Sequence, residues 1–213
     1  MTLTRCIRFV AALLLILLLV AGYRAMHLFF PNLWLPATSE AFKQSESQQR
    51  VNAHIYDTQW FDAARAGRTD ITDALLKAGY PVDTRTSAGY TALVLATYHG
   101  SLDEVNLLLD VGADPCIPDN SGNNALMGAL FKGEMAVAQR LLDLCPINAT
   151  NDNGQTALSF AALFGRLDIL AQLVQRGADP EHRDVKGNSA KMIVEMQGND
   201  AAVAALEAIG ARK

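Results

Sequence analysis

Residues that carry catalysis or bind metal ions are scarce in this sequence. Its 213 residues include three cysteines and four histidines, and the histidines are scattered along the chain. No His-x-x-x-His or Cys-x-x-Cys spacing occurs, so a zinc site is not expected. The nucleophile motif Gly-x-Ser-x-Gly and the phosphate-binding Walker loop are missing too. The sequence therefore predicts a protein that is not an enzyme and that has no cofactor, no catalytic residues and no metal site.

The chain also lacks an excess of basic residues. It has 18 Lys and Arg against 22 Asp and Glu. Three of the basic residues, Arg5, Arg8 and Arg24, precede the first acidic residue, Glu40. Without them, 18 − 3 = 15 basic residues face 22 acidic ones, a balance of about −7. Because nucleic-acid binding needs a basic stripe, we predict no nucleic-acid partner.

The one long hydrophobic run lies near the N-terminus. The segment from Phe9 to Tyr23 carries no charge, and Arg5 and Arg8 precede it. This is the pattern of a signal peptide or a signal anchor. Residues 9–30 have the length of a transmembrane helix, whereas the small residues up to Gly22 would allow cleavage after it. Both alternatives stay open, and we expect a hydrophobic helix here in either case.

These features give a predicted domain order and location. Residues 1–36 are predicted to be a signal anchor or signal peptide with a juxtamembrane segment, and residues 37–56 a linker or lead-in helix. Basic residues ahead of the run favour a cytoplasmic N-terminus. We therefore expect an inner-membrane protein with its remainder in the periplasm, tethered through residues 9–30. The alternative is a periplasmic or secreted protein whose signal has been cleaved.

Glycine spacing reveals an internal repeat in the rest of the chain. One set of glycines is separated by 33, 33, 32 and 33 residues: Gly67, Gly100, Gly133, Gly165 and Gly198. A second set keeps the same phase: Gly89, Gly122, Gly154 and Gly187. Self-similarity at this period is typical of a solenoid built from stacked units. We predict units at about 57–86, 87–119, 120–151, 152–184 and 185–213.

Each unit reads as two short helices. In the best example Thr91 can cap a first helix, in which Leu93 and Ala96 fall on one face. Gly100 ends that helix, and apolar residues at helical spacing predict a second one over 102–111. The fold predicted is therefore an all-α solenoid of helix-turn-helix units.

At these residues the sequence resembles the ankyrin-repeat family. Three units, from Ser87 to Asp184, match the family pattern of a D-x-x-G turn, a first helix, a glycine, and a second helix followed by Gly-Ala-Asp. Degenerate units flank them, as expected where a stack must end. No unit has the family's Pro or His in Thr-Pro-Leu-His; the second unit, for example, reads Thr91-Ala92-Leu93-Val94.

Two cysteines lie within the repeats. Cys116 follows the second unit, and Cys145 stands where the third unit lacks its helix-ending glycine. If the domain were exported, an oxidising compartment would permit a Cys116–Cys145 disulfide. The alternative is a pair of small hydrophobic residues.

The resemblance also implies where a partner would bind. In ankyrin proteins, partners usually occupy the concave face, which is lined by the turn tips and by the residues before each unit's middle glycine. Aromatic or apolar residues recur at that position and would suit binding anchors. The predicted partner-binding residues are Tyr90, Tyr98, His99, Asn123, Phe131, Lys132, Gln155, Leu163, Phe164 and Met196.

These observations predict a protein-binding module, a monomer, that acts as a scaffold or accessory factor for another protein on the exported side of the membrane. Two alternatives stay open. One is an immunity-type inhibitor of a toxin or an envelope enzyme. The other is a structural spacer, which would be favoured if the aromatic residues proved buried.

Overall fold

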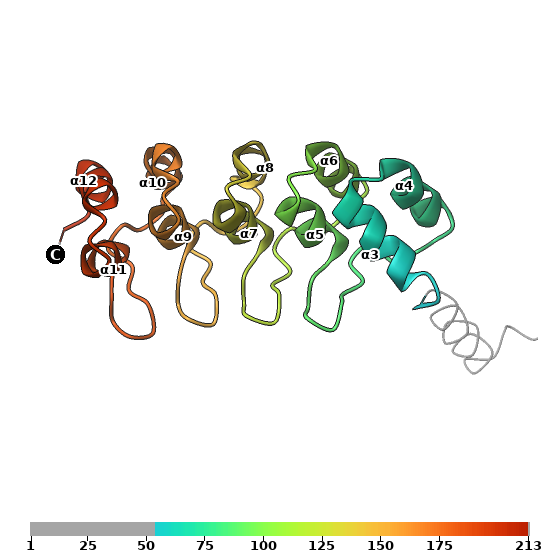
Figure 1. The fold of residues 1–213 in the computed structure, drawn as a ribbon, viewed down its shortest axis with the longest axis horizontal. Coiled ribbons are helices and arrows are strands. Elements are labelled where there is room, and N and C mark those ends of the chain that lie inside the picture. Colours follow the sequence, from blue (N-terminus) through green and yellow to red (C-terminus); the bar gives the residue numbers. More distant parts are fainter. Residues whose placement is uncertain (1–53, 213) are drawn as a thin grey trace, which may run out of the picture. The chain divides into compact units, whose positions relative to one another are not determined.

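The computed structural model describes residues 54–212, which form one row of paired helices. Figure 1 shows the first helix of each pair in one row and the second helix in another, with long turns hanging below the first row. The first helices are α3 (Asp57–Ala66), α5 (Ala92–Tyr98), α7 (Ala125–Lys132), α9 (Ala157–Leu163) and α11 (Ala190–Met196). The second helices are α4 (Thr69–Lys77), α6 (Leu102–Asp110), α8 (Met135–Leu141), α10 (Leu170–Gln175) with the preceding 3-10 turn η1 (Leu167–Ile169), and α12 (Asp200–Ala208).

The described residues are thus all-helical, apart from a single isolated bridge between Arg183 and Ser189. This agrees with the predicted solenoid of helix pairs. The hydrophobic segment 9–30 and the rest of the predicted 1–36 region lie outside the described residues. Among residues 54–212, no helix combines the length and the apolar character needed to cross a membrane.

Polar caps fix where four of the first helices begin. At each start a side-chain oxygen accepts a hydrogen bond from the backbone N–H three residues later, at 3.0 to 3.3 Å. The capping residues are Thr91, Asn124, Thr156 and Ser189. Such a bond satisfies one of the N–H groups that a helix leaves without an internal partner. The capping role predicted for Thr91 is confirmed.

Small and branched side chains alternate in the core. Alanines on the first helices, such as Ala96, Ala129 and Ala161, are fully buried and allow neighbouring units to approach closely. Buried leucines, such as Leu108 and Leu173, fill the space between first and second helices. Every unit therefore covers the apolar face of its neighbour, which is how a solenoid gains stability.

The first and the last of the described units build their part of the core from different residues. In the first unit, the buried Trp60 ring lies 4.7 Å from the ring of Tyr80, whose hydroxyl donates to Asp57 at 2.5 Å. In the last unit, Lys191 takes the position that leucine holds in the three units before it: Leu93, Leu126 and Leu158. Its ammonium group reaches Glu207 of α12 at 2.7 Å. An ion pair between α11 and α12 thus stands where the three preceding units bury a leucine.

Candidate protein-binding face

A row of aromatic rings crosses three consecutive units. We call Tyr90, Tyr98, Phe131 and Phe164 the aromatic row. Neighbouring rings meet edge to face, with centroids 5.6 Å apart for Tyr90–Tyr98, 6.4 Å for Tyr98–Phe131 and 4.8 Å for Phe131–Phe164. Aromatic pairs prefer this geometry, so each ring helps to hold the next one in place.

The exposure of the row grows along the stack. Tyr90 and Tyr98 are half-buried, whereas Phe131 is 45% exposed and Phe164 38% exposed. Burial raises the pKa of Tyr98 to about 12, and the charge of Asp119 and the nearby Tyr90 add to the shift. The row therefore has a fixed, partly buried end and an end that presents bare aromatic surface to solvent.

The other predicted apolar residues divide between core and surface. Leu163 is half-buried and packs against the core, while Met196 in the last unit is 70% exposed. Leu163 and Phe164 were both predicted to be partner-binding residues. The structure brings Phe164 against Phe131, although Leu163 is the residue that corresponds to Phe131 in the repeat.

Two residues that sequence reasoning missed support the row. Phe160 is buried and its ring centroid lies 5.6 Å from that of Phe164. One unit earlier the same helix position holds Gly128, and the Tyr98 ring occupies the space beside it. The side chain at this helix position therefore varies in size from unit to unit. A glycine inside a helix, with a tyrosine in the preceding unit, was the sequence signal that could have pointed to this contact.

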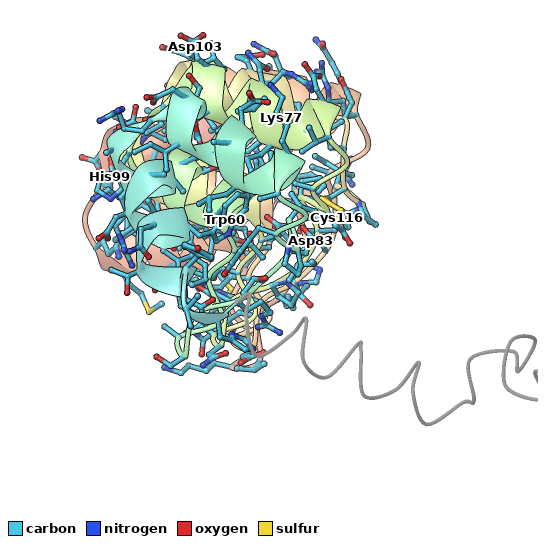
Figure 2. The ribbon with its side chains drawn as sticks, turned by 90° about the vertical axis from the view of Figure 1, so that its right-hand side faces the viewer. Trp60, Lys77, Asp83, His99, Asp103 and Cys116 are labelled. Carbon is cyan, nitrogen blue, oxygen red and sulfur yellow. A yellow bond between two sulfur atoms is a disulfide. The ribbon has the colours of Figure 1, made fainter. Side chains whose placement is uncertain are left out.

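His99 and Lys132 lie at the ends of α5 and α7, next to the row. Both are exposed. Figure 2 shows His99 on the opposite side of the stack from Cys116, so these two residues lie on different faces. Their position allows them to contact a bound partner around the aromatic centre.

The turns between units form a hydrogen-bonded platform. The N–H groups of Asn120, Asp152 and Val185 each donate to a carbonyl of the preceding turn at 3.0 to 3.1 Å. Asn123 accepts a hydrogen bond at 2.9 Å from Asn151, whose own side chain holds its turn together.

Two of the predicted binding residues, Asn123 and Gln155, belong to this platform. The Asn123 amide contacts Asp119 and Asn151, and the Gln155 amide oxygen lies 3.4 Å from the Asn151 nitrogen. These contacts use part of the hydrogen-bonding capacity of both amides within the protein. The platform therefore presents a turn surface whose shape is set before any partner arrives.

Two further features concern site chemistry. Within residues 54–212, no three His, Cys, Asp or Glu side chains lie close enough together to hold a metal ion. Cys116 and Cys145 are joined as a disulfide, with their Cα atoms 5.6 Å apart.

Comparison with known proteins identifies the repeat. The family model described as ankyrin repeats (3 copies) matches residues 45–119 and 105–184. An ankyrin repeat and SAM domain-containing protein 6 from Danio rerio is 35% identical over 136 residues, 60% of this chain and 16% of its own length. Ankyrin repeat domain-containing protein 63 is 39% identical over 106 residues in Mus musculus, covering 47% of this chain and 27% of the relative. The Homo sapiens protein of that name is 40% identical over 97 residues, covering 43% of this chain and 25% of the relative.

These relatives correct the predicted location. The sequence favoured a bacterial protein of the inner membrane with its repeats in the periplasm, or a periplasmic or secreted form. That assignment is wrong, because the matching proteins come from zebrafish, mouse and human. The chain spans 16 to 27% of the length of these relatives. An oxidising periplasm is therefore no longer a reason to expect the Cys116–Cys145 disulfide.

Proposed function

Because the chain belongs to the ankyrin-repeat family, we propose that it acts as a scaffold that binds another protein through the face bearing the aromatic row. Ankyrin repeats are generally protein-interaction modules, and typically they are not enzymes. The observation that carries the proposal is the exposed, edge-to-face pair Phe131–Phe164 beside a rigid platform of turns. Aromatic anchors at the centre of an interface contribute most of its affinity.

Pre-organisation supports the same proposal. The two rings are held by each other and by Tyr98 and Phe160, so few side-chain rotamers remain to be frozen on binding. Association costs less when the surface is ordered in advance. Polar and charged groups at the rim, such as His99 and Lys132, would then select and orient the partner.

The test begins by finding what touches the row. A photo-crosslinking phenylalanine analogue is placed at Phe131 in the full chain, and the crosslinked protein is identified by mass spectrometry. The matched control carries the analogue at Val111, which is equally exposed at 46% but lies at the end of a second helix. We expect one protein to be crosslinked from position 131 and not from position 111.

Affinity then tests the assignment. The identified protein is purified and titrated against the Phe131→Ala/Phe164→Ala variant. We expect a loss of roughly 30-fold or more, the scale of a hot spot. The control variant Val111→Ala/Leu144→Ala removes comparable exposed apolar surface and should bind as the unchanged protein does. Equal crosslinking from both positions, or an unchanged affinity of the Phe131→Ala/Phe164→Ala variant, would exclude the row as the binding site and favour a spacer.

A further inference from the structure

One position in each turn fastens a unit to the next. The residues at this position are Asp83, Cys116, Asn148 and Glu181, which are 33, 32 and 33 residues apart. We call it the clamp position. At three of the four, a side-chain oxygen accepts a hydrogen bond from the backbone N–H 31 residues later, just past the second helix of the following unit.

The three clamps share one geometry. Asp83 accepts from the N–H of Asp114 at 3.1 Å, and Asn148 accepts from the N–H of Asp179 at 2.9 Å. Asn148 also donates to the carbonyl of Gly177 at 2.9 Å. Glu181 accepts from the N–H of Arg212 in the same way.

The third unit cannot make this bond. It is one residue shorter than its neighbours, so the counterpart of Asp114 and Asp179 is Pro146, 33 residues before Asp179. Proline has no backbone N–H to donate.

The end of the helix in the third unit is weaker as well. In the other second helices a glycine N–H bonds the carbonyl three residues back, as Gly112 does with Leu109. Here Leu144 makes that bond to Leu141, so Leu144, and not Cys145 as the sequence suggested, takes the place of the glycine. The next residue of the other units, such as Ala113 and Ala178, bonds five residues back, and among the described residues no such bond is made by Cys145.

The disulfide occupies the place of the missing clamp. Cys116 is at the clamp position, and its partner Cys145 directly precedes Pro146. Figure 2 shows Asp83 and Cys116 on the same side of the stack, as expected for corresponding positions. The bond spans residues 116–145, so it encloses both helices of the third unit, α7 and α8. Both cysteines are partly exposed to solvent, which leaves them within reach of a reductant.

We propose that the Cys116–Cys145 disulfide is a redox-sensitive clamp that replaces the hydrogen-bond clamp in the third unit. An external dithiol reduces it: the S–S bond breaks, two electrons and two protons pass to the cysteines, and the dithiol closes to its own disulfide. The reduced third unit has neither fastening at its end. Because each repeat contacts only its neighbours, loss of this fastening weakens the junction and lets the middle of the stack open more often.

Reduction of the disulfide should also affect the aromatic row, and this part of the inference rests on the proposed function. Phe131 belongs to α7, inside the enclosed unit, and stands between Tyr98 and Phe164. Opening of the third unit would therefore break the row at its centre. Oxidised protein would present the face, and reduced protein would present it less often.

Hydrogen exchange tests the clamp without any partner. The full chain carries Cys6→Ser, so that only one cysteine pair responds to reduction. Exchange of α7 and α8 amides is compared in oxidised and dithiol-reduced protein. We expect roughly 400-fold faster exchange after reduction, the scale of a lost cross-link around a loop of about 30 residues. Helices α11 and α12, away from the junction, serve as the internal reference and should change far less.

A double variant supplies the matched control. Cys116→Asn with Pro146→Asp restores the amide acceptor found at Asn148 and the N–H donor found at Asp179. We expect the amides of α7 and α8 in this variant to exchange roughly 5-fold more slowly than in the reduced protein, the scale of one hydrogen bond, and to exchange alike with and without dithiol. The proposal is overturned if oxidised and reduced protein exchange alike, or if air-oxidised protein keeps two free thiols. Neither result would bear on the binding face, which has its own test by crosslinking.

Discussion

The ring of Tyr98 lies against Gly128 of the following unit. A Cβ atom built on Gly128 would be 3.5 Å from Cε1 and Cζ of that ring, which is ordinary van der Waals contact. Gly128 sits inside α7 with no positive φ. The backbone conformation at this position therefore does not require glycine, although glycine lowers the stability of the helix. The space between Gly128 and the tyrosine ring is just large enough for one methyl group.

Gly128→Ala is consequently expected to stabilise the protein. Alanine is favoured over glycine inside a helix by about 1 kcal/mol, and the new methyl group would touch the tyrosine ring without displacing it. Urea denaturation should show a higher midpoint. A lower midpoint would mean that the Tyr98 ring has no room to keep its place in the row.

Gly122→Ala provides the opposite case. Gly122 has a φ of 80°, and a Cβ there would lie 2.6 Å from the backbone nitrogen of Asp152. An L-residue is strained in this conformation, and the clash falls on backbone atoms that cannot swing aside. We expect destabilisation of more than about 1 kcal/mol in the same measurement.

Most of the helical framework could be predicted from the sequence, because it depends on local rules repeated at a fixed period. Thr91 caps its helix as expected, and the glycine phase separates the units. The placement of Phe164 against Phe131 could not be predicted, since it depends on the size of side chains in the neighbouring unit. The sequence placed the residue that ends the second helix of the third unit one position too late, at Cys145 and not at Leu144. A one-residue deletion can fall at several points of a unit, and only the packing of the side chains decides where.

Thr156 should be the most informative of the caps. It is 1% exposed, and it and Ser159 bond each other's backbone N–H groups at 3.3 and 3.4 Å. Thr156→Ala removes a cap and leaves a buried N–H without its partner, so we expect a loss of about 1 kcal/mol in urea denaturation. Thr156→Ser keeps the hydroxyl and should retain most of the stability. Equal losses in the two variants would show that the methyl group, and not the cap, is what matters.

Arg166 should stabilise the row from the adjacent unit. Its Nε donates to the carbonyl of Leu130 at 3.0 Å and its Nη2 to that of Phe131 at 3.3 Å, so it satisfies carbonyls at the end of α7. Arg166→Met keeps the apolar stem but removes both donors, and we expect a loss of about 1 kcal/mol. Arg176→Met is the control, because its bonds to Asp143 are exposed. The prediction fails if the two variants have the same stability.

The buried carboxyl group of Glu104 should make the stability of the protein depend on pH. Its side chain is fully buried between α4 and α6, where Thr72 donates to one carboxylate oxygen. The other oxygen, Oε2, has no hydrogen-bond partner among the described residues. Burial raises the pKa of Glu104 above its ordinary value of 4.5, the charge of Asp70 raises it further, and the Thr72 bond only partly offsets this.

The direction of this pH dependence follows from a comparison with the unfolded chain, in which Glu104 keeps its ordinary pKa. Below about pH 4.5 the carboxyl is neutral in both states and its burial is tolerated. As the pH rises towards the higher pKa of the folded state, the unfolded chain ionises first, so the free energy of unfolding falls. Glu104→Gln removes this titration, and the variant should gain stability relative to the unchanged protein between acid and neutral pH. Denaturation midpoints measured across that range would test this, with the exposed Asp103→Asn on the same helix as the control. A constant difference at every pH would show that Glu104 is ionised in the folded protein with its ordinary pKa.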